Sequence, residues 1–290
     1  MKFLWCLIAI SMFRSPVFAQ RVQVGLFGGA SAYSGDIVSK TFPGHKETKG
    51  AFGFTLNYQL TDQIVLRGGI TFAAVAGADS LSNNTAQQYR NLSFQSSITE
   101  FNLLGEYYVF NLYDQRYSPY FFAGLAVYHF DPFAYNLAGN KIFLKPLSTE
   151  GEGINGYPDR RPYSLTQLAI PFGGGLKFVI NDNLRIGVEL GMRKLFTDYL
   201  DDVSKSYIDQ TDLFNARGGV AVQISYRSDE LPNGNPAYPA KDQQRGNNKK
   251  LDWYYIGGIH LTYLLGGESR KNSGFSRKRK SRMGCPANPM

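Results

Sequence analysis

The chain has 290 residues, a formal net charge of +8, an aromatic content of 14% and 31 glycines. This mixture of aromatic residues and glycines is poor in helix formers and typical of β-sheet proteins. Of the two cysteines, Cys6 falls in the amino-terminal segment described next, so Cys285 has no partner for an internal disulfide. A soluble β-sandwich and an outer-membrane β-barrel both remain open on composition alone.

Residues 1–19 have the pattern of a secretory signal peptide. Lys2 gives a positive start, an apolar stretch follows, and small residues ending at Ala19 precede a cleavage position before Gln20. The apolar stretch is shorter than the roughly 20 residues of a spanning helix. We therefore predict an exported protein whose mature chain begins near Gln20.

Eight later segments alternate apolar and polar residues with a period of two, which indicates β-strands. In the seventh segment, for example, Ile186 and Val188 alternate with Arg185 and Glu189. Each segment reaches the roughly 9–11 residues of a tilted transmembrane strand. The predicted strands are 22–32, 50–60, 63–75, 97–110, 119–131, 164–180, 184–197 and 251–265.

The spacers between these strands alternate strictly between short and long. The short ones are 61–63, 111–118 and 181–183, and the long ones are about 33–49, 76–96, 132–163 and 198–250. Outer-membrane barrels have short periplasmic turns and long external loops, whereas a sandwich has no reason to sort its loops in this way. The spacing therefore predicts an all-β protein, an eight-stranded antiparallel transmembrane β-barrel of OmpA/OmpX-like size.

This fold prediction implies a location and an orientation. Residues 20–265 would form the barrel in the lipid of a Gram-negative outer membrane, with both chain termini in the periplasm. Residues 218–226 also alternate and could add a strand, but nine is an odd number that bacterial single-chain barrels avoid. We interpret 218–226 as a helix or an extra-membrane hairpin within the last external loop.

Charged residues also fall on the inward faces of the predicted strands. An eight-stranded barrel is barely wide enough for its own side chains, and an unpaired buried charge is costly. We therefore predict a structural network of ion pairs that plugs the lumen. An ion path is the alternative, but it needs a water column that eight strands do not readily provide, and no small-molecule substrate is expected. The predicted network comprises Arg67, Glu100, Glu106, Lys177, Arg185, Glu189 and Arg193.

The histidines are the first place to look for catalysis. They are His45 in the first loop, His129 near the outer end of the fifth strand, and His260 on the inner face of the last strand. Barrel enzymes that act on lipids combine a histidine with a serine and an acid near the external rim. His129 precedes Asp131, but no serine lies at a fixed near spacing. The histidines therefore predict no catalytic residue.

Two further patterns were weighed as sites. Asp201 and Asp202 follow the seventh strand, where an outer-membrane protease would place an acid pair, but adjacent loop aspartates are far more often solvated turn or capping groups. The glycines 173–175 lie within a strand and are no phosphate loop, and no metal-ligand spacing occurs. We predict no cofactor and no metal.

The segment 266–290 is a strongly basic tail. Beyond Gly267 it carries seven basic residues against Glu268 alone, a net charge of +6. The signal peptide excludes nucleic acid as its partner. A disordered solubilising tail and a docking segment for an acidic periplasmic partner or anionic lipid headgroups both remain open. The docking interpretation assigns partner binding to Arg277, Lys278, Arg279, Lys280 and Arg282, and pairing with another chain to Cys285.

Four segments resemble the PorG-like outer-membrane barrels of the type IX (Por) secretion system. Residues 25–36 end in Tyr-Ser-Gly-Asp and are similar to the opening strand of that family, which ends in Tyr-x-Gly-Asp. Residues 199–207, with the run Asp-Asp-Val-Ser, resemble the segment after its seventh strand. Residues 225–229 and the terminal Cys285-Pro286 also fit. The resemblance spans nearly the whole mature chain.

This resemblance implies a non-enzymatic component of a secretion machine. PorG-like proteins anchor a periplasmic ring of PorK and PorN under the outer membrane, and the periplasmic turns and the basic tail would supply the contact. The family offers no catalytic residues, and we expect the two rim motifs to be structural. Two alternatives stay open, namely a structural or adhesive barrel that acts through its external loops and a barrel enzyme that modifies lipid or peptide.

Overall fold

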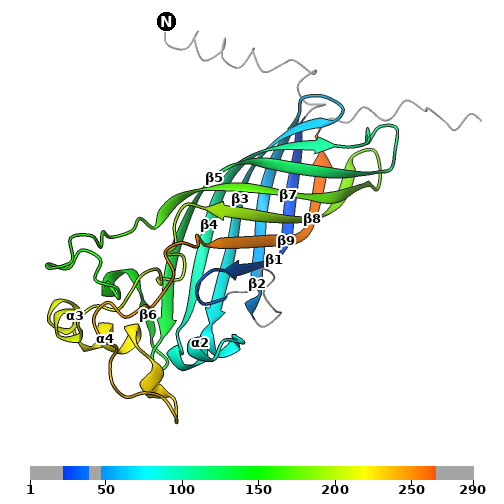
Figure 1. Cartoon of the computed structure of the whole chain (residues 1–290). Coiled ribbons are helices and arrows are strands. Elements are labelled where there is room, and N and C mark those ends of the chain that lie inside the picture. Colours follow the sequence, from blue (N-terminus) through cyan, green and yellow to red (C-terminus); the bar gives the residue numbers. More distant parts are fainter. Residues whose placement is uncertain (1–21, 39–46, 266–290) are drawn as a thin grey trace, which may run out of the picture.

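The computed structural model describes residues 22–38 and 47–265. In this part of the chain, eight antiparallel strands close into a barrel, because β4 pairs with β3 on one side and β5 on the other (Figure 1). The predicted eight-stranded antiparallel barrel is therefore confirmed. Its strands are β1 (Val22–Ser34), β2 (Lys49–Gln59), β3 (Ile64–Ala78), β4 (Ser93–Tyr108), β5 (Tyr117–Tyr135), β7 (Thr166–Val179), β8 (Leu184–Leu195) and β9 (Trp253–Leu264).

Four strands are longer than the sequence predicted, and β1 is the least extended of them, by two residues to Ser34. β3 continues to Ala78, β4 begins at Ser93, and β5 continues to Tyr135 and pairs with the short strand β6 (Lys141–Phe143) beyond the barrel. These extensions were interpreted as loops because outward residues such as Ser93 and Gln95 are polar. A polar outward face is expected where a strand leaves the apolar zone of a bilayer.

The outward faces of the strands form an apolar belt. Leu26, Phe54 and Leu125 are all more than half exposed. An exposed apolar belt around a closed barrel is the surface that faces lipid in an outer-membrane protein. Aromatic side chains gather along one margin of this belt, as expected at a membrane interface, and the protein is a transmembrane β-barrel of the outer-membrane type. The aromatic margin contains Tyr107, Phe110, Tyr117, Phe178 and Tyr263.

The belt can be tested with one matched pair of substitutions. Leu125, 68% exposed on β5, lies in the belt, whereas Leu137, 71% exposed, lies between β5 and β6 outside it. Leu125→Arg should destabilise the barrel by about 2–4 kcal/mol, because a cation on the lipid face near the midplane costs that much. Leu137→Arg should have little effect. Urea unfolding in lipid vesicles measures both, and equal losses would contradict the lipid exposure of Leu125.

The two ends of the barrel differ. The end with the short connections 60–63, 109–116 and 180–183 is called the turn end, and the opposite end is called the loop end. The turns are closed by their own polar side chains, since Thr61 Oγ1 accepts from the Ile64 amide and Asn181 Oδ1 from the Leu184 amide. Both the first strand and the last strand reach the turn end, where Gln23 lies opposite Leu264.

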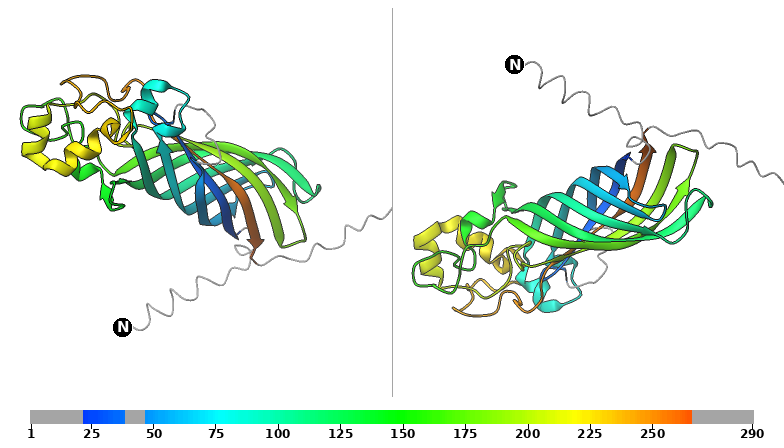
Figure 2. Two further views of the ribbon diagram at one scale, coloured as in Figure 1. Left: turned by 90° about the horizontal axis from the view of Figure 1, so that it is seen from below. Right: turned by 90° about the horizontal axis from the view of Figure 1, so that it is seen from above.

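The loops at the other end fold into a cap (Figures 1 and 2). The last loop of the cap contains two adjacent helices, and Gly218, with a φ of 82°, separates them. The segment 218–226 is therefore largely helical, which is one of the two outcomes predicted for it. None of the helices in residues 22–38 and 47–265 is long and apolar enough to cross a membrane. The helices of the cap are α2 (Thr85–Arg90), α3 (Gln210–Arg217) and α4 (Gly219–Ser225), with short 3₁₀ turns at Asp79–Leu81, Lys145–Leu147 and Ser228–Glu230.

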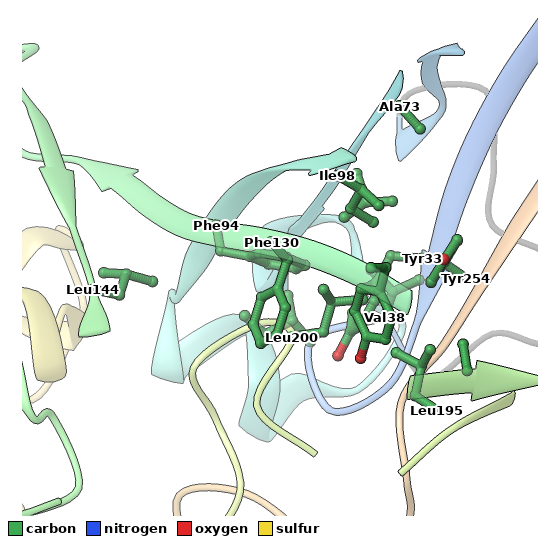
Figure 3. Packing of buried hydrophobic residues seen from close by; sticks show 14 of the residues in the cluster. Tyr33, Val38, Ala73, Phe94, Ile98, Phe130, Leu144, Leu195, Leu200 and Tyr254 are labelled. Atoms are coloured by element: carbon green, nitrogen blue, oxygen red, sulfur yellow. The ribbon is translucent and has the colours of Figure 1, made fainter. Parts of the chain in front are cut away.

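Buried apolar residues continue from the lumen into the cap. Tyr33, Phe130 and Tyr254 from the strands pack with Val38 and Leu200 from the loops in one cluster (Figure 3). Nearer the turn end, a smaller cluster fills the lumen, and the cap has a third cluster of its own around α3 and α4. This continuity predicts that the cap and the barrel are held as one packed unit.

Candidate functional site

The centre of the lumen is occupied by the Arg67 guanidinium. Its Nη1 lies 3.0 Å from Glu106 Oε1 and 2.7 Å from Glu189 Oε2, and all three side chains are nearly inaccessible. Lys177 Nζ lies 3.5 Å from Glu106 Oε2 on the other side. Two acids thus face two bases in a space from which water is largely excluded, which is the condition under which ion pairs hold strongly once formed.

A second ion pair lies between this centre and the cap. Arg193 Nε is 3.1 Å from Glu100 Oε2. The same carboxylate accepts from the Tyr254 hydroxyl at 2.5 Å and from Asn102 Nδ2 at 2.7 Å, so both of its oxygens are used. Six of the seven residues predicted to form a lumen network therefore occur in ion pairs.

The seventh residue, Arg185, does not fit the predicted pairing. It is buried near the turn end but forms no ion pair with any described residue, and its guanidinium lies 5.5 Å from the centre of the Tyr113 ring. Arg185 is the second residue of β8, so it lies nearer the turn end than Glu189, the carboxylate on the same strand. A cation–π contact takes the place of the expected carboxylate.

Phenol hydroxyls complete the network, and the sequence analysis missed them. Tyr120 donates to Glu189 Oε2 at 2.6 Å, and Tyr108 donates to Glu106 while accepting from Lys177 Nζ at 2.8 Å. Tyr108 and Tyr120 look like ordinary core aromatics because their strands are rich in aromatic residues. The available signal was the inward parity of these positions, which Tyr108 shares with Glu106 on β4.

The side chains leave little room for a channel. The cavity that remains beside Arg67, Glu189 and His260 has a volume of 20 Å³. A cavity of that size holds about one water molecule. The lumen at this level is therefore a plug built from side chains, not a conduit.

One group of side chains in the lumen has the composition of a metal site. Donor atoms of Glu106, Glu189 and His260 lie within 4.8 Å of one another. The Arg67 Nη1 group, however, lies within 3.0 Å of both carboxylates and 3.4 Å from His260 Nδ1. The guanidinium thus stands where a cation would be bound, and the group does not fit a metal ion.

The loop end holds a second polar site, which joins the two motifs noted in the sequence. The Tyr33 hydroxyl lies 2.6 Å from Asp201 Oδ2 and 2.9 Å from Asp252 Oδ1, and its oxygen accepts from the Asp36 amide at 3.0 Å. A phenol has one proton to donate. The second carboxyl contact is therefore a hydrogen bond only if that carboxyl carries a proton. Burial raises the pKa of both Asp201 and Asp252, so we expect a further proton shared by Asp201, Tyr33 and Asp252.

Asp202 and Glu150 form the other half of this site. Asp202 accepts from the Thr149 and Tyr163 hydroxyls at 2.6 and 2.7 Å, and Glu150 lies 3.1 Å from Arg245 Nη1. The expectation that the adjacent aspartates are solvated turn groups was wrong, since Asp201 is 1% exposed and Asp202 is fully buried. The cap folds over both carboxyls because buried hydroxyls and amides from distant loops hydrogen-bond them.

The carboxyl pKa values at the loop end are raised accordingly. Burial, followed by the charge of Asp36, raises the pKa of Asp201 to about 8 and that of Asp198 to about 9. Burial, followed by the charge of Asp202, raises the pKa of Glu152 to about 8. One oxygen of Glu152 meets no hydrogen-bond partner among the described residues. These carboxyls are therefore proton-bound in the folded cap near neutral pH.

This protonation predicts that the cap loosens as the pH rises. An unfolded aspartate titrates near pH 3.9, so between about pH 4 and pH 9 the folded cap binds more protons than the unfolded chain. The stabilisation is complete below the unfolded pKa and is lost as the pH rises through the folded values of about 8 and 9. Hydrogen exchange of residues 198–204, corrected for intrinsic rates, should show weaker protection at about pH 9 than at about pH 5.

The barrel strands provide the control for this measurement. Amides of β2 and β3 should keep their protection over the same range, because no carboxyl of the loop-end site lies on them. Protection of 198–204 that stays constant or increases at alkaline pH would contradict the proton-bound site.

The remaining candidate residues are placed as follows. His129 is exposed, and its ring Nδ1 lies 3.0 Å from the Thr166 hydroxyl. Asp131, two residues further along β5, pairs with Ser97 of β4. His260 is buried in the lumen, where its Nε2 lies 2.9 Å from Thr55 Oγ1. His45 and the tentative partner-binding residues lie outside the described residues, the latter being Arg277, Lys278, Arg279, Lys280, Arg282 and Cys285.

Comparisons with known proteins give one family match and several similar solved structures. A family model described as a domain of unknown function (DUF6089) matches residues 1–143. No curated protein matches the chain. Similar solved structures include Neisserial surface protein A at 9% identity, covering 84% of this chain and 97% of that chain with a TM-score of 0.41.

Two further solved structures are similar to the chain. Pseudomonas aeruginosa OprG is 11% identical over 85% of this chain and 98% of that chain, with a TM-score of 0.39. The attachment invasion locus protein Ail of Yersinia pestis is 9% identical over 84% of this chain and 97% of that chain, with a TM-score of 0.37. Because these sequence identities and TM-scores are low, the assignment of the barrel rests on the strand pairing and the apolar belt of the chain itself.

Proposed function

We propose that this barrel is a non-enzymatic outer-membrane component of the type IX protein secretion machinery. In this role the turn end faces the periplasm, and the turns and the basic tail contact a periplasmic ring of PorK- and PorN-like proteins. The proposal rests on the resemblance to PorG-like barrels together with the geometry of the two barrel ends.

The position of the last strand is the observation that carries the proposal. The Leu264 amide donates to Asn183 O at 2.8 Å, and the Leu265 amide donates to Val22 O at 2.9 Å. The last strand therefore ends beside the 180–183 turn and the first strand. The described chain thus ends at the turn end, and the segment that follows it, 266–290, carries a net charge of +6. A basic segment that continues from this end would suit an acidic periplasmic partner.

The packed interior supports an anchoring role over a transport role. Ion pairs and phenols fill the lumen around Arg67, and apolar side chains fill the remainder. A barrel of this kind has a rigid wall and no wide path. The two motifs shared with PorG-like barrels meet at Tyr33 and Asp201, where they join the first and last loops into one structure.

The test is a comparison of crosslinked neighbours in the native host. A tagged full chain, a chain ending at Gly267 and a full-length chain with its tail charges replaced by glutamine would be crosslinked in parallel. The neutralised chain is the matched control, because it keeps the length of the tail and removes only the charge. Its substituted positions are Arg270, Lys271, Arg277, Lys278, Arg279, Lys280 and Arg282.

Each outcome decides a part of the proposal. Ring subunits recovered only with the full chain would assign the contact to the tail charges, and recovery with the neutralised chain would assign it to the tail without its charges. Recovery with all three chains would move the contact to the turns and keep the scaffold role. An assembled barrel that recovers no ring subunits in any form would overturn the secretion role.

A structural or adhesive barrel is the second candidate. The observation that favours it is the folded cap, because long loops with their own buried core present a defined surface at the loop end. Deletion of the α3–α4 segment with the tail intact discriminates the two candidates. A loss of cell attachment with unchanged ring assembly would favour the adhesive role. An enzyme is the third candidate, and His129→Ala would then abolish activity without affecting assembly.

A further inference from the structure

A cavity of 520 Å³ opens at the loop end, apart from the plug and the buried carboxyls beneath it. Three segments far apart in the sequence line it, namely Gly35–Asp36 after β1, the helix α2, and the last loop between 207 and 250. Figure 1 shows α2 at the loop end of the barrel. The volume falls in the range of about 300–1,000 Å³ that small-ligand sites occupy.

The walls of this cavity are polar, and their charged residues are one acid, Asp36, one lysine, Lys250, and two arginines. Its two arginines are already committed, since Arg90 lies 2.7 Å from Asp79 and Arg245 lies 3.1 Å from Glu150. The groups most common in the walls are carboxamides and tyrosines. The carboxamides are Asn84, Gln87, Asn235, Gln243, Gln244 and Asn247, and the tyrosines are Tyr89, Tyr207 and Tyr226.

Tyr207 is the one buried tyrosine of these walls whose hydroxyl is left without a partner. The residue is 3% exposed, and its ring packs edge-on against Tyr226 and Tyr238. Among the described residues its backbone is hydrogen-bonded, to Gln243 and Asp242, but its hydroxyl is not. The neighbouring Tyr226 hydroxyl, by contrast, donates to Asn235 O at 2.6 Å. Unlike the enclosed hydroxyl of Tyr128, the Tyr207 hydroxyl is accessible from the cavity that this residue lines, so it is open to a ligand.

We infer that this cavity binds a neutral saccharide. A carboxamide both donates and accepts, and most of those in the wall keep one of these functions for a ligand. Asn84 and Asn235, for example, use the oxygen on a backbone amide and retain the NH2 group for the hydroxyls of a sugar. The exposed ring of Tyr89 supplies a flat apolar face for the C–H face of a sugar ring. An anionic ligand would find both guanidinium groups already paired, and the wall's lysine, Lys250, acts on the carboxyl of Asp36. The inference does not depend on the secretion role proposed above.

The test uses a substitution that removes no hydrogen bond from the unliganded protein. Purified full-length barrel would be titrated with two probes, the host's own intact lipopolysaccharide and the polysaccharide released from it by mild acid, and screened against immobilised neutral oligosaccharides. Tyr207→Phe should leave the melting temperature unchanged and weaken saccharide binding roughly tenfold, the effect of one lost hydrogen bond. Tyr135→Phe, an exposed tyrosine outside the cavity wall, is the matched control and should bind as the unsubstituted chain does.

The outcomes separate the source of the sugar from the existence of the site. Binding of both intact and released material would identify the polysaccharide of the outer leaflet as the ligand. Binding only on the oligosaccharide array would identify a free saccharide. If neither probe nor array binds the unsubstituted chain, or if Tyr207→Phe and Tyr89→Ala bind as tightly as it does, the inference is overturned.

Discussion

Arg67→Met is expected to destabilise the barrel by about 3–5 kcal/mol, the effect of removing one partner from a buried ion pair. Arg67 contacts both Glu106 and Glu189, so its loss leaves two carboxylates in the lumen with Lys177 as the one cation within ion-pairing distance of Glu106. Methionine preserves most of the volume, which separates the loss of charge from a cavity. Urea unfolding in lipid vesicles measures the change in the free energy of unfolding.

The chain offers a matched control in the same lumen. Arg185 is equally buried but forms no ion pair with a described residue, so Arg185→Met should cost much less than Arg67→Met. Adding Glu189→Gln to Arg67→Met should restore part of the lost stability, because it removes the orphaned carboxylate while Glu106 keeps Lys177 as its partner. Equal effects of the two arginine substitutions would refute the central position of Arg67 in the network.

Tyr33→Phe is expected to loosen the cap by about 2–3 kcal/mol while the barrel remains assembled. The substitution removes the hydroxyl that both Asp201 and Asp252 contact, and it leaves the Asp36 amide without its acceptor. Buried polar groups that lose a partner each cost about 1–3 kcal/mol. Limited proteolysis of the loops, and hydrogen exchange of residues 198–204, should report the change.

Tyr128→Phe is the control for this experiment. Tyr128 is also fully buried on the barrel interior, but its hydroxyl has no hydrogen-bond partner among the described residues. Its removal should be neutral or slightly stabilising. A second comparison uses Asp252, where asparagine can donate to the Tyr33 oxygen as a protonated carboxyl does. Asp252→Asn should therefore be tolerated better than Asp252→Ala, and the reverse order would contradict a shared proton.

Much of the barrel was predictable because its signals are local. A period of two identifies a strand with one apolar face, and turn residues such as Asp62 and Asn181 mark where the chain reverses. The inward positions of Arg67, Glu100 and Arg193 follow from the same alternation. The extensions of β3, β4 and β5 were missed, because the regular alternation with an apolar outward face stops there. In β4, for example, Ser93 and Gln95 are polar while Phe94 between them is buried.

The sequence by itself therefore determined the number of strands, the asymmetry of the two ends and the set of charges that point inward. Only the tertiary structure decided which of those charges meet and that the loops are folded. Arg67 and Glu189 are 122 residues apart, and Tyr33 and Asp201 are 168 apart. Contacts between such distant residues depend on the closure of the barrel and on the register of β9 with β8 and with β1. Both are properties of the whole sheet. Alternation along one strand contains no information about its neighbour across the lumen.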